Sequence, residues 1–244
     1  MGEHVPVTDE RLLPLAAAPE RAAILLDVDG TLAPIVAVPE DARVPDETRA
    51  ELRRLVRRYS LVACVSGRTG ADAAGIVDVD GIVYVGAHGL ELDPRAGDWR
   101  ARLRNFAATV DWPVEDKGVT VSFHYRTAAD EAAARAYLET IAARAGAEGL
   151  RARFGRKVLE LRPPVDADKG TAISQLVAGD SVSRALYAGD DTTDLDAFRG
   201  LRDSGLELAV CVAVASEEAP STLVAAADLV VPGTEGMLEL LRGL

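Results

Sequence analysis

Asp27-Val28-Asp29-Gly30-Thr31 directly follows the apolar run Ala22 to Leu26. A short apolar run that ends in two carboxylates is typical of a buried parallel strand. Open α/β sheets place their ligand sites at the carboxyl ends of such strands. Asp27 and Asp29 leave the strand on one side, and Gly30 lets the chain turn so that both acids converge. One acid can then be a nucleophile and the other a general acid and base.

Three further polar clusters follow in a fixed order along the chain. Ser66-Gly67-Arg68 ends the apolar run Leu61 to Val65, and Lys169-Gly170 opens a helical pattern. The segment Gly189 to Asp194, with the sequence GDDTTD, ends a third run that starts at Arg184. Together with the Asp27 stretch, these clusters resemble the haloacid dehalogenase superfamily. Most members of that superfamily are magnesium-dependent phosphatases.

The resemblance implies a role for each core residue. Asp27 is the expected nucleophile, and Asp29 is the expected acid for the leaving alkoxide and then the base for water. An anionic nucleophile and a phosphate dianion repel each other, so a divalent cation is needed between them. Mg²⁺ prefers oxygen ligands, and the carboxylates of Asp27 and Asp190 with the backbone carbonyl of Asp29 are expected to supply them. Ser66 and Lys169 are expected to hold the remaining phosphoryl oxygens.

Other residues of these clusters have less defined expectations. Asp191 and Asp194 are candidates for metal ligands, for groups that orient the ligands, or for helix N-caps. Of the two, we favour Asp194 as an orienting group. Gly67, Arg68 and His88 are expected to bind the substrate.

Composition excludes several classes of function. The chain has 244 residues and a formal net charge of −12, which argues against nucleic acid and anionic membrane partners. No apolar run reaches the roughly 20 residues that a membrane span requires. The N-terminus is acidic, and Pro14 breaks its apolar patch, so we expect no signal peptide. Cys64 and Cys211 lie inside apolar runs, as core residues do, and we expect a cytoplasmic monomer.

The arrangement of elements predicts an α/β protein with two parts. Apolar runs alternate with helical patterns, such as the one that starts at Asp46, and predict a doubly wound, Rossmann-like parallel sheet. Residues 119–125 instead alternate apolar and polar side chains, which is typical of an antiparallel sheet with one covered face. A helix with Asp130 as its N-cap, a turn at 154–156 and a strand at 158–161 follow. We therefore predict a small α+β cap at 97–167, inserted in a core of 1–96 and 168–244.

The cap segments carry a narrower resemblance. The segments 114–118, 124–126 and 155–163, together with Gly86 to Glu91, are similar to those of trehalose-6-phosphate phosphatases. This resemblance covers the chain from Ile24 to about Phe198, and it implies hydrolysis of trehalose 6-phosphate. Carboxylates and ammonium groups suit sugar hydroxyls, because they accept and donate hydrogen bonds respectively. The residues expected to read the sugar are Glu115, Lys117, His124, Arg126, Lys157 and Glu160.

Lysine usage and strand parity refine this set. Of the 27 basic residues, 24 are arginines, so Lys117, Lys157 and Lys169 stand out as positions that need a compact ammonium. Lys157 and Glu160 differ in parity and cannot share a face of a regular strand. Either one of them is structural, or Lys157 lies in a turn after Gly155.

Alternatives to trehalose 6-phosphate remain open. The first is a phosphatase for another sugar or cyclitol phosphate, such as sucrose 6-phosphate. The second is a non-catalytic domain that binds a sugar phosphate and regulates a synthase. The chain retains Asp27, Asp29 and Lys169, which argues against the second alternative. In every case the expected partner is a small sugar phosphate.

Overall fold

A computed structural model describes residues 9–36, 38–155, 157–216 and 219–244. The chain divides into two compact units, residues 1–89 with 167–244 and residues 90–166. We call them the core unit and the cap unit, and we describe each by itself. In the described ranges, no helix combines the length and the apolar character that a membrane crossing requires.

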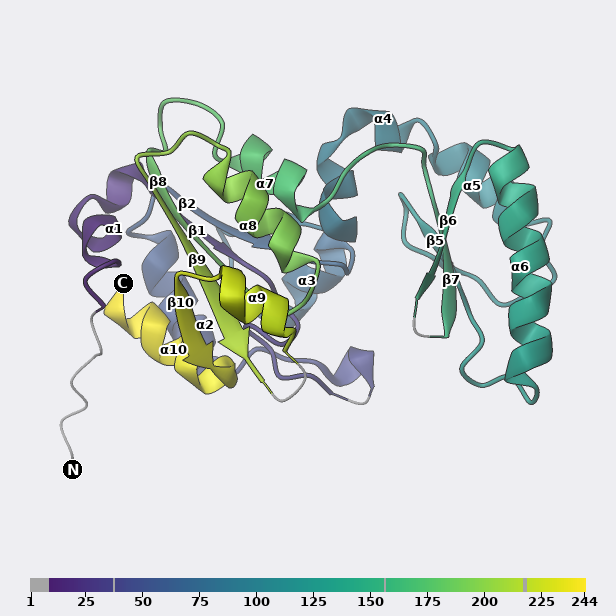
Figure 1. The fold of residues 1–244 in the computed structure, drawn as a ribbon, viewed down its shortest axis with the longest axis horizontal. Helices are drawn as coiled ribbons and strands as arrows, with labels where there is room; N and C mark the ends of the chain where they lie inside the picture. The colour runs from purple at the N-terminus through teal and green to yellow at the C-terminus, as the bar shows by residue number, and fades with distance from the viewer. Residues whose placement is uncertain (1–8, 37, 156, 217–218) are drawn as a thin grey trace. The chain divides into compact units, whose positions relative to one another are not determined.

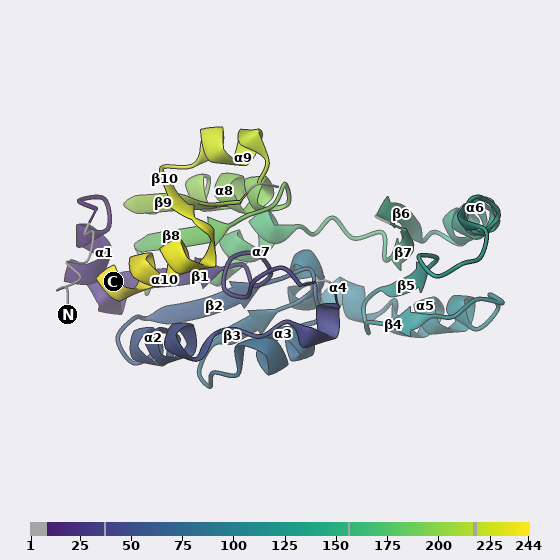
Figure 2. The same ribbon diagram turned by 90° about the horizontal axis from the view of Figure 1, so that it is seen from below.

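The core unit contains the predicted parallel sheet (Figure 1). Its six strands lie in the order β10-β9-β8-β1-β2-β3, which Figure 2 shows from top to bottom. Strands β2 and β3 lie on one side of β1, and strands β8, β9 and β10 lie on its other side. Ligand sites of doubly wound sheets lie where the order reverses in this way. The strand bounds are β1 Ala22–Leu26, β2 Leu61–Val65, β3 Val83–Val85, β8 Arg184–Gly189, β9 Leu208–Ala215 and β10 Leu229–Pro232.

Helices cover both faces of the core sheet. Ile24 and Leu26 of β1 belong to a core cluster that includes buried residues of α2 (Asp46–Val56), α3 (Gly70–Val77) and α10 (Gly233–Gly243). Residues of opposite parity face the other side, where Tyr187 of β8 meets Phe198 edge-on at a centroid distance of 6.1 Å. Phe198 belongs to α8, so α8 and its neighbour α7 cover this second face of the sheet. Asp27 lies on the same face, because it comes two residues after Leu25, the partner of Tyr187. These two helices span Lys169–Leu176 (α7) and Asp194–Arg202 (α8), and the short helices are α1 Leu13–Ala17, α9 Ser221–Ala226, η1 Pro19–Arg21 and η2 Pro39–Asp41.

Helices α7 and α8 cross with their backbones in contact. A Cβ atom on Gly170 would lie 2.3 Å from the carbonyl oxygen of Asp196, and one on Gly200 would lie 2.2 Å from the carbonyl oxygen of Gly170. No side chain fits at either position without moving the helices apart. This close crossing brings the first residues of the two helices, Lys169 and Asp194, next to each other.

The cap unit is the predicted α+β element. Its antiparallel sheet has the order β4-β5-β7-β6, with bounds β4 Glu115–Asp116, β5 Val121–His124, β7 Val158–Arg162 and β6 Arg151–Gly155. The predicted alternation is confirmed in part, because Val121 and Phe123 join a buried cluster with residues of two helices while Ser122 faces the opposite side. The strand is shorter than predicted, however, and Ser122 on the polar face is buried as well. These helices are α5 Arg100–Ala107 and α6 Glu131–Ala147, and α4 (Pro94–Gly97) and η3 (Ala87–Leu92) precede them.

Local predictions in the cap unit had mixed outcomes. The Asp130 N-cap is confirmed, because its carboxylate accepts a hydrogen bond from the Ala133 backbone N–H at 2.9 Å. The predicted turn at 154–156 is wrong for Phe154 and Gly155, which end strand β6, while Arg156 lies outside the described residues. β6 is an edge strand with mostly exposed residues, so it has no apolar alternation that a sequence pattern could detect. In the core unit, Cys64 and Cys211 are buried and free, as predicted.

Candidate active site

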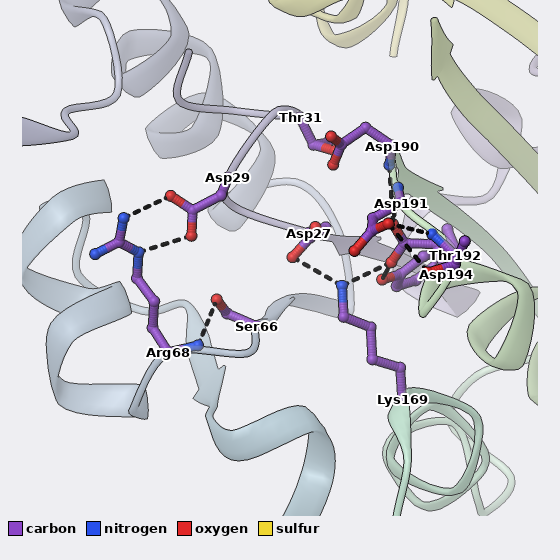
Figure 3. A network of polar contacts seen from close by, with 11 residues as sticks. Asp27, Asp29, Thr31, Ser66, Arg68, Lys169, Asp190, Asp191, Thr192 and Asp194 are labelled. Carbon is purple, nitrogen blue, oxygen red and sulfur yellow. Dashed lines mark hydrogen bonds and ion pairs between the residues drawn. The ribbon is translucent and has the colours of Figure 1, made fainter. Parts of the chain in front are cut away.

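Asp27 and Lys169 form a buried ion pair at the end of β1. Lys169 is the first residue of α7, where Asp168 and Thr171 make a reciprocal capping box that fixes the start of the helix. The Lys169 Nζ lies 3.0 Å from Asp27 Oδ1 and 2.7 Å from Asp194 Oδ1 (Figure 3). Only 2% of the Lys169 side chain is exposed, so the two carboxylates replace water in stabilising its positive charge.

Asp190 follows β8, the strand that neighbours β1 in the sheet. Its carboxylate lies against the turn at Gly30, where an added Cβ would come within 2.0 Å of Asp190 Oδ2. Gly30 also has a φ of 79°, a conformation that a side chain would strain. The Thr31 hydroxyl donates a long hydrogen bond of 3.4 Å to Asp190 Oδ1. A hollow of about 400 Å³, lined in part by Gly30 and Asp190, opens beside this carboxylate.

Asp194 is fully buried and receives four hydrogen bonds. Its Oδ1 accepts from Lys169 Nζ and from the Tyr187 hydroxyl, both at 2.7 Å. Its Oδ2 accepts from the backbone N–H groups of Asp190 at 2.9 Å and Asp191 at 2.8 Å. A metal would have to displace one of these donors, which favours the orienting role for Asp194. Asp191 is exposed, and its carboxylate accepts a hydrogen bond from the backbone N–H of Thr192 at 2.6 Å, a contact typical of a local turn.

The electrostatics of this cluster favour a divalent cation. One ligand oxygen from each of Asp27, Asp190 and Asp194 lies within 4.8 Å of the others. Burial raises the pKa of Asp27 well above its usual value, against the opposing charge of Lys169. Burial and the negative charge of Asp194 raise the pKa of Asp190 to about 7. Burial disfavours the charge of Lys169, but Asp27 and Asp194 outweigh this and raise its pKa. Three carboxylates beside a single ammonium are an oxygen-rich set with an excess of negative charge, which suits a hard cation such as Mg²⁺.

Asp29 points away from this cluster toward Arg68 (Figure 3). The Arg68 Nε and Nη2 donate to the two oxygens of Asp29, both at 2.7 Å, in a bidentate ion pair. The partner raises the pKa of the Arg68 guanidinium through these hydrogen bonds. Ser66 is buried beside them, and its hydroxyl oxygen accepts from the Arg68 backbone N–H at 3.2 Å. Arg68, predicted to bind substrate, is therefore held by the predicted general acid.

The loop after β3 is hydrogen-bonded to the Ser66 loop. The Ala87 N–H donates to the Arg68 carbonyl at 2.7 Å, and the His88 N–H donates to the Ser66 carbonyl at 2.9 Å. The His88 ring lies so close to Gly67 that a Cβ there would be 2.6 Å from the imidazole. Ala87 and His88 both have positive φ, 50° and 53°, which is uncommon for residues with side chains. The structure thus brings Gly67, Arg68 and His88 together beside Ser66.

Three predicted sugar-binding residues of the cap unit lie together. The Glu115 carboxylate is 2.7 Å from His124 Nε2 and 3.5 Å from Lys117 Nζ. Glu160 of β7 and Glu115 of β4 both pair in register with Ser122 of β5, so the two carboxylates share a face of the sheet. This face therefore presents two acids with a lysine and a histidine, groups that can accept from and donate to hydroxyls.

Two other predicted residues of the cap unit lie apart from that set. Lys157 is in the turn after β6, one of the two predicted alternatives, with a φ of 60°. Its Nζ pairs at 2.6 Å with Glu131, the first residue of α6, and not with Glu160. Arg126 is exposed in the turn after β5, without an ion pair to any residue that the structure describes.

Sequence analysis missed three polar residues of these sites. Tyr187 and Thr31 are buried in the core unit, and Ser122 is buried at the polar face of the cap sheet. Thr31 belongs to the quoted motif, but its contact with Asp190 depends on a segment about 160 residues away. The one available signal for Tyr187 was a single polar side chain in the otherwise apolar run Ala185 to Ala188.

Comparison with known families agrees with this geometry. The model of the trehalose-phosphatase family matches residues 25–227, which include Asp27, Asp29, Ser66, Lys169 and Asp190. The chain belongs to the trehalose-phosphatase family. Among its curated relatives are the trehalose-phosphate phosphatase of Mycobacterium avium, 36% identical over 206 residues, and a probable trehalose-phosphate phosphatase of Oryza sativa, 30% identical over 246 residues. The matches cover 74% and 83% of this chain.

The chain covers only part of the length of these relatives. The chain spans 51% of the M. avium protein, 65% of the O. sativa protein and 16% of an uncharacterized glycosyl hydrolase of Mycobacterium tuberculosis that is 35% identical. Among solved structures, a trehalose-6-phosphate phosphatase related protein matches 90% of this chain with a TM-score of 0.69 and 24% identity. The Aspergillus fumigatus trehalose-6-phosphate phosphatase matches 98% with a TM-score of 0.64 and 23% identity. At these identities the structures confirm the trehalose-phosphatase fold, a Rossmann-like core with an α+β cap.

Proposed function

We propose that this chain is a phosphatase that hydrolyses trehalose 6-phosphate to trehalose and phosphate. The observation that carries the proposal is the buried carboxylate of Asp27, held by Lys169 beside Asp190 at the switch point of the sheet. Membership of the trehalose-phosphatase family supports the choice of substrate. In the cap unit, the cluster of Glu115, Lys117 and His124 offers the donors and acceptors that a disaccharide requires.

Magnesium is the cofactor that we propose for this site. Asp27 and Asp190 would hold it through their carboxylates, and the resemblance adds the carbonyl of Asp29. When bound, the ion offsets the repulsion between the Asp27 carboxylate and the phosphate dianion. The excess of carboxylates over cations in the cluster supports this assignment.

The first step transfers the phosphoryl group to the protein. An oxygen of Asp27 attacks the phosphorus, and the bond from phosphorus to the sugar oxygen breaks. The leaving oxygen takes a proton from Asp29. An ammonium has three N–H donors, and Lys169 uses one on Asp27 and one on Asp194, so the third is left for a phosphoryl oxygen. Before it can give this proton, Asp29 must break its bidentate contact with Arg68, because that contact engages both of its oxygens.

The second step restores the protein. Water attacks the phosphorus of the aspartyl-phosphate and gives a proton to Asp29, and the bond between phosphorus and Asp27 breaks. Asp27 is again a carboxylate and Asp29 is again protonated. The balance is one phosphate ester and one water converted to one alcohol and one phosphate.

Phosphate release across a substrate panel tests this function. We expect kcat/KM for trehalose 6-phosphate to exceed those for sucrose 6-phosphate, glucose 6-phosphate and a cyclitol phosphate by at least about tenfold. A higher value for one of the other esters would assign that ester as the substrate. Binding of a sugar phosphate without release from any ester would favour the non-catalytic alternative.

Magnesium affinity should depend on pH through Asp190. Its pKa is raised from 3.8 to about 7, so in the metal-free protein the proton leaves only near neutral pH. Mg²⁺ competes with that proton and with any proton on Asp27, so its apparent dissociation constant should fall at least about tenfold between pH 6 and pH 8. Isothermal titration at several pH values, in buffers with different ionisation enthalpies, measures both the affinity and the released proton. Asp190→Asn is the control, and it should remove both the binding and its pH dependence.

The same pKa has a consequence for stability with a defined sign. The folded state retains the Asp190 proton more tightly than the unfolded chain between about pH 4 and pH 7. In the metal-free protein, this group therefore contributes less to the free energy of unfolding as pH rises through that window. Added Mg²⁺ should raise Tm more at pH 7.5 than at pH 5.5. An equal rise at both pH values would contradict the assignment of Asp190 as a ligand.

A further inference from the structure

We propose that Tyr187 is a positioning residue that keeps the Lys169 ammonium shared between Asp194 and Asp27. The inference rests on the proposed function, because it concerns the cation that holds the phosphoryl group. Tyr187 lies in the middle of β8, directly opposite Leu25 of β1 in the register of the sheet. It is thus two residues below Asp27 on the same face of the neighbouring strand.

The Tyr187 hydroxyl is placed rigidly. The side chain is fully buried, and its ring packs edge-on against Phe198 of α8. The hydroxyl donates to Asp194 Oδ1 at 2.7 Å, the same oxygen that accepts from Lys169 Nζ at 2.7 Å. A buried phenol that donates to a buried carboxylate has little freedom to rotate away from it. Tyr187 therefore acts directly on the Asp194 oxygen that binds Lys169.

The balance of donors explains why this contact matters. Asp194 distributes its negative charge over the hydroxyl of Tyr187, two backbone N–H groups and Lys169. Without the hydroxyl, Oδ1 would retain Lys169 as its one remaining partner among the contacts described. A buried carboxylate with fewer donors attracts an ammonium more strongly, since little solvent screens it. Lys169 would then move toward Asp194 and away from Asp27, whose contact is already the longer at 3.0 Å.

The displaced ammonium would lose its alignment with the phosphoryl group. One N–H of Lys169 has to point to Asp27 and one to Asp194 for the third to reach a phosphoryl oxygen. Electrostatic stabilisation of the transferring group depends on such prior alignment. Among the hydrogen bonds of the described residues, that of the Tyr187 hydroxyl goes to Asp194, so its effect on the reaction is expected to pass through Asp194 and Lys169.

Comparison of Tyr187→Phe with Tyr59→Phe tests the inference in the full chain. Tyr59 is also buried in the core unit, and its hydroxyl donates a hydrogen bond to the main-chain oxygen of Leu244 at 2.9 Å. Each variant removes one buried hydroxyl and keeps the ring, so both should fold with a modest loss of Tm. We expect kcat to fall about tenfold or more in Tyr187→Phe, for trehalose 6-phosphate and for p-nitrophenyl phosphate alike, with a smaller change of KM. Tyr59→Phe should retain the kcat of the unchanged protein.

Inhibition by orthovanadate gives a second measurement that a merely structural role would not affect. Vanadate takes the place of the transferring phosphoryl group, so its inhibition constant should rise in Tyr187→Phe and stay unchanged in Tyr59→Phe. Equal kcat and equal inhibition constants in the two variants would overturn the positioning role. A different outcome, in which neither the unchanged protein nor Tyr59→Phe releases phosphate from any ester, would overturn the proposed function and this inference with it.

Discussion

Asp27→Asn is expected to lower kcat by at least about a thousandfold, which is roughly 4 kcal/mol in the barrier. The amide is nearly isosteric with the carboxylate but is a poor nucleophile and a poor ligand for Mg²⁺. It therefore removes the attacking atom and weakens the cation site in one change. Loss of the phosphorylated intermediate can be followed by acid quench of the protein during turnover. The release of phosphate from trehalose 6-phosphate measures the rate.

The fold should survive the Asp27→Asn change. Asp27 is one of three neighbouring carboxylates, two of which pair with Lys169, and burial already disfavours its charge. Lys169 keeps Asp194 as a partner at 2.7 Å, so no buried charge is left alone. We expect Tm to stay within a few degrees or to rise. Asp180→Asn, the same change at an exposed position of the core unit, is the control and should retain full activity. Near-normal turnover in folded Asp27→Asn protein would exclude the covalent mechanism.

Glu115→Ala and Lys117→Ala are expected to separate sugar recognition from the chemical step. Each should lower kcat/KM for trehalose 6-phosphate by about tenfold to a hundredfold, the usual cost of a lost hydrogen bond to a charged group. The loss for p-nitrophenyl phosphate should be less than about threefold, because this ester has no sugar hydroxyls to bind. Glu115 holds both His124 and Lys117, so Glu115→Ala should have the larger effect.

A matched variant controls for changes in the cap unit itself. Glu139 of α6 is exposed and pairs with Arg135 at 3.1 Å, so Glu139→Ala also removes an ion-paired carboxylate from this unit. It should leave kcat/KM for both substrates unchanged. Equal losses on the two substrates in Glu115→Ala would show that Glu115 stabilises the protein and does not recognise the sugar. Lys169→Ala provides the opposite pattern, since a core change should damage both substrates alike.

Much of the core site follows from sequence because its signals are local. Asp27 and Asp190 each end an apolar run, and such runs are strands whether or not their partners are known. Parallel strands bring their carboxyl ends to one edge, so residues far apart in the chain can be expected to meet there. The alternation at 119–125 and the Asp130 N-cap are local in the same sense. Strand β6 was missed because its exposed edge residues carry no periodic pattern.

The contacts within the site were decided by tertiary structure alone. Nothing in the sequence pairs Arg68 with Asp29, because the two lie on separate loops whose approach depends on the register of β1 and β2. Lys157 meets Glu131 through a turn with positive φ, which no propensity of lysine predicts.

The environment of Lys169 shows the same division most clearly. Sequence patterns alone predicted that a lysine opens a helix and that an acid follows each of the strands β1 and β8. The close crossing of α7 and α8 at Gly170 and Gly200 decided that Lys169 lies within reach of Asp194. Parity and sheet register then decided that Tyr187 shares that oxygen. The physical reason is that a sequence specifies which groups stand at the end of each element, whereas the partner of a buried group depends on how elements pack at distances of a few ångströms.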